Sequence, residues 1–132
     1  MKNLLFSIIL LLAMSPVFAG KPVRLKVVYF HSEHRCPTCI SIEENTKKVL
    51  NTYYAKELKE GTITFVSLDV EEKQNLKMVE KYEAEGSSLY LTGINNSKET
   101  TTDLTNFAFS YSRNQPEKFM TGLKAEIEKK LK

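Results

Sequence analysis

The sequence contains 132 residues, of which 42% are hydrophobic and 27% are charged, with 5 glycines and 4 prolines. This composition excludes collagen-like and wholly disordered chains, and the length predicts one compact domain. The formal net charge of +3 comes from interleaved acidic and basic residues without a basic block, so we expect no nucleic-acid partner.

Residues 1–19 predict a secretory signal peptide. Lys2 precedes an apolar run of 11 residues from Leu4 to Met14, and the small Ala19 follows Val17, a pattern typical of a signal-peptidase site. A helix that crosses a membrane needs about 20 apolar residues. We therefore expect an exported protein, periplasmic or secreted, whose mature part at 20–132 is monomeric and does not contact the membrane after cleavage.

The first predicted strand leads directly to both cysteines of the sequence. The segment from Arg24 to Phe30 ends in a continuous apolar and aromatic run, which predicts a buried strand. A polar stretch and then Cys36-Pro37-Thr38-Cys39 follow. Pro37 suits the first turn of a helix, so Cys36 is expected at the N-cap of an amphipathic helix that ends at Gly61. The residues that recur at three- and four-residue spacing in this helix are Ile42, Thr46, Val49, Leu50, Tyr53 and Leu58.

The middle of the chain predicts two further strands with a helix between them. Residues 62–70 carry apolar side chains on both faces and predict a second central strand. Leu76, Val79 and Tyr82 follow at helical spacing. Residues 88–94, rich in leucine and tyrosine, predict the third strand.

The last part of the chain predicts a hairpin and two helices. Asn95-Asn96 is a turn signal, after which residues 98–103 are expected to return antiparallel to the third strand. A short helix is predicted from Leu104 to Tyr111. Asn114 and Glu117 resemble a capping box at the start of the final helix. The apolar stripe of this helix comprises Phe119, Leu123, Ile127 and Leu131.

The predicted order is β–α–β–α–β–β–α. A strand–helix–strand unit of this length implies parallel strands joined by a right-handed crossover. We therefore predict an α/β fold with a central mixed β-sheet flanked by helices, and we expect Tyr53, Tyr54 and Tyr82 to contribute to its core.

The cysteine pair is the chemically informative motif. Unpaired N–H groups and the positive end of the helix dipole favour the thiolate at Cys36, and Arg35 and protonated His34 add positive charge, so a lowered pKa is predicted for Cys36. Cys39 lies one helical turn later, at a spacing that a disulfide tolerates. The sequence predicts that Cys36 attacks a disulfide and that Cys39 then releases the client as a thiol.

Two other interpretations of the cysteines remain open. The pair could be a structural disulfide, although closing so short a loop would stabilise the fold little. Alternatively, His31, His34, Cys36 and Cys39 could bind Cu(I) or Zn without catalysis. The sequence shows no Ser-His-Asp order, phosphate-binding glycine loop, or flavin or nicotinamide site, and we expect no cofactor.

From 20 to 132 the chain resembles the thioredoxin superfamily. The resemblance rests on Val27–Phe30, Cys36–Cys39 and Gly86–Leu91. It implies a thioredoxin-like fold and thiol–disulfide oxidoreductase activity, with Cys36 and Cys39 as catalytic residues and a protein as redox partner.

More narrowly, the chain looks like an exported family described as nitrophenyl-compound nitroreductase subunits and associated with arsenic-resistance gene clusters. This likeness is carried by Tyr29–His31, His34–Cys39, Ile42–Glu44, Thr102–Thr105 and Pro116–Phe119. It implies an accessory redox role in a nitroreductase or in an arsenic-related system.

Three positions depart from the thioredoxin pattern. Arg35 replaces the tryptophan before the first cysteine, and the usual buried acid, counted six residues back from that cysteine, would fall at Phe30. The position of the cis-proline that faces the cysteines falls at Ser88. Because that proline binds substrate backbone and excludes metals, its replacement favours binding of metals or arsenite. Together with the neighbours of the cysteines, this position completes the set expected to tune the cysteines or face the substrate: Arg35, His34, Pro37, Thr38 and Ser88.

Overall fold

The computed structural model describes residues 20–132, so the predicted signal peptide lies outside the described residues. The centre of the fold is a four-stranded sheet in the order β2-β1-β3-β4. The strands are β1 (Leu25–His31), β2 (Ile63–Asp69), β3 (Ser88–Asn95) and β4 (Lys98–Asp103). β1 is parallel to β2 and antiparallel to β3, and β4 is antiparallel to β3. The predicted mixed sheet is therefore confirmed.

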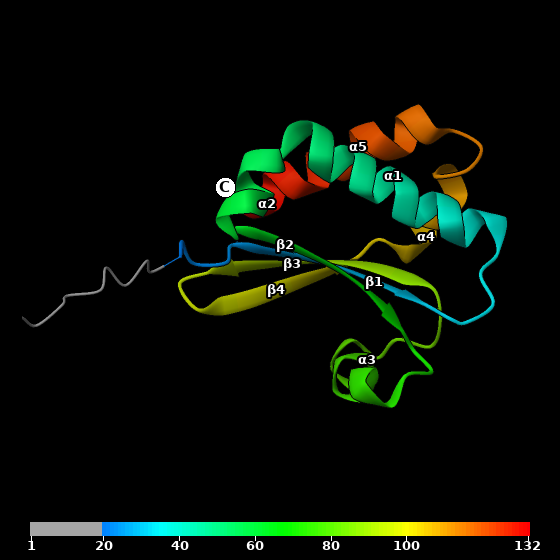
Figure 1. Ribbon diagram of the computed structural model, residues 1–132. Coiled ribbons are helices and arrows are strands. Elements are labelled where there is room, and N and C mark those ends of the chain that lie inside the picture. The colour runs from blue at the N-terminus through cyan, green and yellow to red at the C-terminus, as the bar shows by residue number, and fades with distance from the viewer. Residues whose placement is uncertain (1–19) are drawn as a thin grey trace, which may run out of the picture.

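Helices cover both faces of this sheet (Figure 1). Four of them, α1, α2, α4 and α5, lie over one face, and α3 lies on the opposite face together with a single 3-10 turn at Lys73–Asn75. The helices are α1 (Pro37–Tyr53), α2 (Ala55–Glu60), α3 (Leu76–Tyr82), α4 (Thr105–Tyr111) and α5 (Pro116–Leu131). In the described part of the chain, no helix is both long and apolar enough to cross a membrane.

The alternation of β1 divides the core into two clusters. Leu25, Val27 and Tyr29 pack with α1 and α5 in the larger cluster. Val28 and Phe30 pack on the other face, against the residues around α3. Because β1 is buried on both faces, its apolar run is continuous rather than alternating.

The predicted first helix is wrong in one respect, because two helices occupy its range. Tyr54 leaves the helical conformation, with φ −132° and ψ 25°, while its ring is buried. Tyr53 is 55% exposed and does not join the core, whereas Tyr54 and Tyr82 do. The break allows α2 to turn back toward β2, and Gly61 ends α2 in the left-handed conformation at φ 79°, as glycine permits.

Two other local predictions are corrected by the packing. β2 lies at the edge of the sheet and not in its centre. Its apolar side chains nevertheless pack on both faces of the sheet, Ile63 and Phe65 with the larger cluster and Leu68 with the smaller one. The apolar pattern of a strand shows which faces are covered and not how many strands lie beside it, so this edge strand resembles a central one. The predicted capping box is absent, since Pro116 begins α5 and makes Gln115, not Asn114, the N-cap.

Candidate functional site

Cys36 and Cys39 form a disulfide at the start of α1, with their Cα atoms 5.0 Å apart. Cys36 is the N-cap residue and is exposed, whereas Cys39 is buried in the first turn at 6% exposure. Cys36 is therefore the more accessible of the two cysteines. The attacking role predicted for Cys36 and the resolving role predicted for Cys39 require such a difference.

The N-terminus of α1 acts directly on the sulfur of Cys36. The backbone N–H of Cys39 donates a hydrogen bond to Cys36 Sγ over 3.0 Å. Such a donor, together with the positive end of the helix dipole, stabilises a negative sulfur more than a neutral one. Reduction of the disulfide therefore leaves Cys36 in a position that favours its thiolate.

Tyr29, and not Phe30, is the β1 residue beneath the cysteines. Its hydroxyl donates to the backbone carbonyl of Cys39 over 2.7 Å, and its ring is fully buried. Burial raises the pKa of Tyr29, and hydrogen bonds with Arg35 and Ser87 act against that rise. Phe30 points to the opposite face, so the position counted for a buried acid lies away from the disulfide.

Arg35 is held beside Tyr29 by a buried carboxylate of α1. Its guanidinium lies 5.8 Å from the centre of the Tyr29 ring and forms an ion pair with Glu43. Lys47 donates to the other oxygen of Glu43 over 2.8 Å. Burial alone would raise the pKa of Glu43, but the hydrogen bonds from Lys47 and Arg35 and the charge of Arg35 outweigh it and lower the pKa to about 2. Glu43 therefore stays ionised and is not a proton acceptor near neutral pH.

Because of this ion pair, we expect the stability of the protein to fall in acid. Glu43→Gln should reduce the free energy of unfolding near neutral pH by about 1–3 kcal/mol. Because the folded-state pKa is lowered, the contribution of Glu43 is fully present above the ordinary value of 4.5 and disappears as the pH falls toward 2. Urea unfolding at a series of pH values should show the two proteins converging in acid.

Glu44→Gln is the matched control, because it removes the same charge from an exposed neighbouring position. It should keep the pH dependence of the unaltered protein. If Glu43→Gln and Glu44→Gln gave the same curves, the ion pair would not be the source of the acid sensitivity.

Ser87 contacts the buried sulfur, and Ser88 does not. The hydroxyl of Ser87 lies 3.4 Å from Cys39 Sγ. Ser88 is buried, and its hydroxyl donates to the carbonyl of Gly86 over 3.0 Å. Ser88 pairs with Phe30 in the sheet, so the residue before it turns toward α1. The sequence favoured Ser88 for the position that faces the cysteines, one residue after the serine that contacts Cys39.

The other predicted site residues lie around Cys36 without joining one cluster. His34 and Pro37 are exposed, Thr38 is half-buried, and the ring of His31 contacts the carbonyl of Ser32 over 3.1 Å. Within residues 20–132, no three His, Cys, Asp or Glu side chains are arranged to hold a metal ion. The four-residue ligand set of His31, His34 and the cysteines is thus not assembled.

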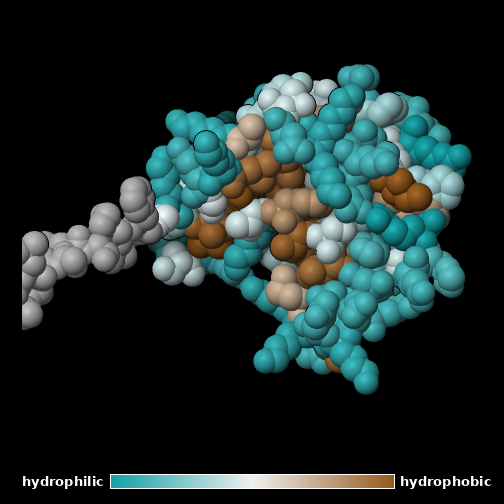
Figure 2. Space-filling model, viewed as in Figure 1, coloured by the Kyte–Doolittle hydropathy of each residue, from teal (hydrophilic) through white to brown (hydrophobic). Residues whose placement is uncertain are grey.

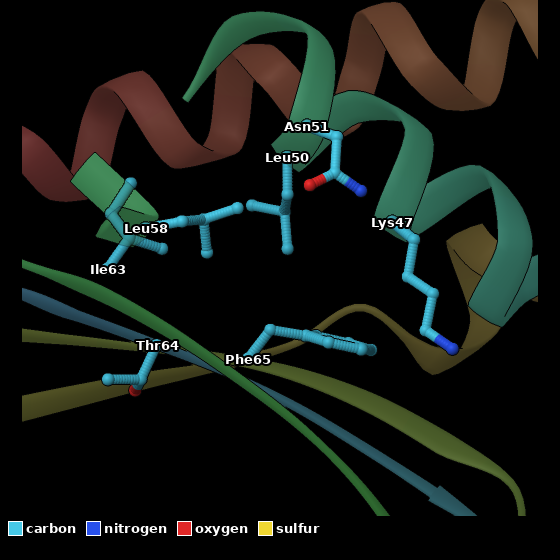
Figure 3. A pocket seen from close by; sticks show the side chains of 7 residues that line it. All are labelled: Lys47, Leu50, Asn51, Leu58, Ile63, Thr64 and Phe65. Carbon is cyan, nitrogen blue, oxygen red and sulfur yellow. The ribbon is translucent and has the colours of Figure 1, made fainter. Parts of the chain in front are cut away.

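An apolar groove lies beside β2, separate from the cysteines. Figure 2 shows hydrophobic side chains gathered between the helices and the edge of the sheet. The hollow there measures about 450 Å³, and in Figure 3 side chains of α1 and α2 face Phe65 of β2 across it. Its walls include Lys47, Leu50, Asn51, Leu58, Ile63 and Phe65. The disulfide is a surface site and does not line this hollow.

Comparisons with known proteins find weak similarity in sequence and in structure. No protein-family model matches the sequence, and no curated protein matches it. A solved structure described as that of a malarial protein is 16% identical, with a TM-score of 0.44 over 75% of this chain and 96% of that one. Thioredoxin of Fasciola hepatica is 26% identical, with a TM-score of 0.40 over 60% of this chain and 66% of that one.

Proposed function

We propose that this domain is a thiol–disulfide oxidoreductase that exchanges electrons with a protein partner through Cys36 and Cys39. The observation that carries the proposal is the disulfide at the N-terminus of α1, in which one sulfur is exposed and the other is buried. A purely structural role explains this geometry less well, because a bridge that closes so short a loop restricts the unfolded chain little.

The proposed cycle is an exchange of two electrons. The Cys36 thiolate attacks a client disulfide, forms a mixed disulfide and releases one client thiolate, which takes a proton from solvent. Cys39 then loses its proton, attacks Cys36 Sγ and releases the second client thiolate. The cysteine pair is oxidised to the disulfide and the client disulfide is reduced to two thiols. The reverse sequence oxidises a client dithiol.

The residues around the pair have distinct roles in this proposal. The backbone N–H of Cys39 and the helix dipole stabilise the Cys36 thiolate. His34, Pro37 and Thr38 lie close to Cys36 in the chain and are at least partly exposed, so we expect them to form part of the surface that a client meets. Arg35 is fixed underneath by Glu43, which keeps a positive charge next to Tyr29.

The cellular setting is also a proposal. The predicted signal peptide supports an exported protein, and an oxidising compartment is where disulfide chemistry on clients persists. The resemblance to nitroreductase subunits supports an accessory role within a larger reductase or an arsenic-related system. Co-purification from the native host tests this association. Equilibrium dialysis of the reduced protein against Cu(I), Zn and arsenite measures whether the cysteine pair retains these ions. Tight retention would favour a metal or metalloid carrier over an electron-transfer protein.

The direct test of the proposed function is capture of the client. Cys39→Ser removes the resolving sulfur and leaves Cys36 exposed, so mixed disulfides with client proteins should accumulate and disappear on addition of reductant. Non-reducing electrophoresis after acid quenching measures them. The control is the double variant that carries both Cys36→Ser and Cys39→Ser, and it should trap no client protein. Equal trapping by both variants would remove the support for Cys36 as the attacking group.

A further inference from the structure

The buried sulfur of Cys39 has a polar contact that the proposed cycle has not used. Ser87, in the loop before β3, places its hydroxyl 3.4 Å from Cys39 Sγ, within hydrogen-bonding distance for sulfur. Cys39 is 6% exposed, whereas Ser87 is half-buried. The hydroxyl therefore lies between a nearly dry sulfur and the solvent.

Cys39 needs such a group because it must lose a proton before it can attack. Burial among apolar side chains disfavours a thiolate. Neither of two positions considered for a nearby carboxylate serves: position 30 is a phenylalanine that lies on the other face of the sheet. The carboxylate of Glu43 is paired with Arg35 and Lys47. The hydroxyl of Tyr29 is directed to the carbonyl of Cys39 and not to its sulfur.

We propose that Ser87 is a catalytic residue of the resolving step, in which its hydroxyl stabilises the Cys39 thiolate and passes the Cys39 proton to solvent. This inference rests on the proposed function. As the thiol deprotonates, Ser87 Oγ accepts its proton and gives up its own to water, and then donates to the thiolate. The thiolate attacks Cys36 Sγ and expels the client thiolate, which solvent protonates. The serine ends the step unchanged, and no further oxidant or reductant is required.

The two steps can be separated with dithiobis(nitrobenzoate), an aromatic disulfide whose thiolate product is coloured. Attack by Cys36 on excess reagent under stopped flow releases the first coloured thiolate, and attack by Cys39 on the mixed disulfide releases the second. In Ser87→Ala the second release should slow about tenfold, the fold-change that corresponds to one pKa unit, while the first release keeps its rate. The pH at which the second rate reaches half its maximum should rise by about one unit.

Two variants control for a merely structural effect. Ser87→Thr keeps a hydroxyl and should restore the second release. Ser110→Ala removes an exposed serine hydroxyl of α4 that bonds the Asn106 carbonyl, and should change neither release. The inference is overturned if the second release in Ser87→Ala is as fast as in the unaltered protein, or if both releases slow equally. A missing second release in the unaltered protein would instead contradict the proposed function itself.

Discussion

Cys36→Ser should abolish disulfide reductase activity, lowering turnover of a protein disulfide by at least about a thousandfold, to the uncatalysed background. Cys36 is the exposed sulfur and the one that accepts the N–H bond at the start of α1. A serine hydroxyl in its place stays protonated near neutral pH and does not attack disulfides. Cys39 cannot substitute for it, because its sulfur is buried in the first helical turn.

The measurement is reduction of a protein disulfide at a fixed concentration of dithiol reductant. The control is a measurement of stability, because Cys36→Ser and the reduced unaltered protein both lack the disulfide. Cys36→Ser and the reduced unaltered protein should unfold at similar urea concentrations, so that lost activity is not lost folding. Substantial turnover by a folded Cys36→Ser protein would show that the reaction occurs elsewhere.

Phe119→Ala should produce the largest loss of stability, about 3–5 kcal/mol in the free energy of unfolding. Phe119 lies on α5 with no exposed surface, and its ring stacks on Phe107 at 5.7 Å between centroids. Truncation leaves a cavity between α5 and the sheet that neighbouring side chains fill only partly. The loss is a large part of the 5–15 kcal/mol that stabilises a typical domain, so the variant should unfold at much lower urea concentrations.

Phe109→Ala is the matched control, since Phe109 lies on the adjacent helix α4 and is 39% exposed. The same chemical change there should cost about 1 kcal/mol or less. The unaltered protein, Phe119→Ala and Phe109→Ala are compared in the oxidised state by urea unfolding. The three unfolding curves are fitted with one common dependence of the free energy of unfolding on urea concentration. A similar cost at both positions would contradict the burial-based account of the core.

The sequence could predict the order of elements because each one has a strong local signal. Pro37 and Gly61 mark helix ends, α5 has an apolar stripe at helical spacing, and β1 is a short apolar run rich in β-branched and aromatic residues. The hairpin of β3 and β4 follows from its turn signal, although the two turn residues are Asn96 and Ser97, both with positive φ.

The errors fall where tertiary packing decides between equivalent patterns. Periodicity places Tyr53 and Tyr54 on similar helix faces, and only the return of the chain toward β2 selects Tyr54 for the core. Counting residues back from Cys36 gives Phe30, whereas the length of the intervening loop places Tyr29 beneath the cysteines. The same one-residue ambiguity separates Ser87 from Ser88. In a strand, a shift of one residue exchanges the two faces.

The central position of β1 has a consequence for the cysteines that follow it. β1 is hydrogen-bonded on both edges and covered on both faces, whereas the layer on the α3 side is built from one short helix and a 3-10 turn. Local opening events release such thin peripheral layers first and central strands last. The loop that carries Cys36 is thus anchored to the slowest-opening part of the domain, and the spacing of the two sulfurs withstands fluctuations that uncover other parts of the molecule.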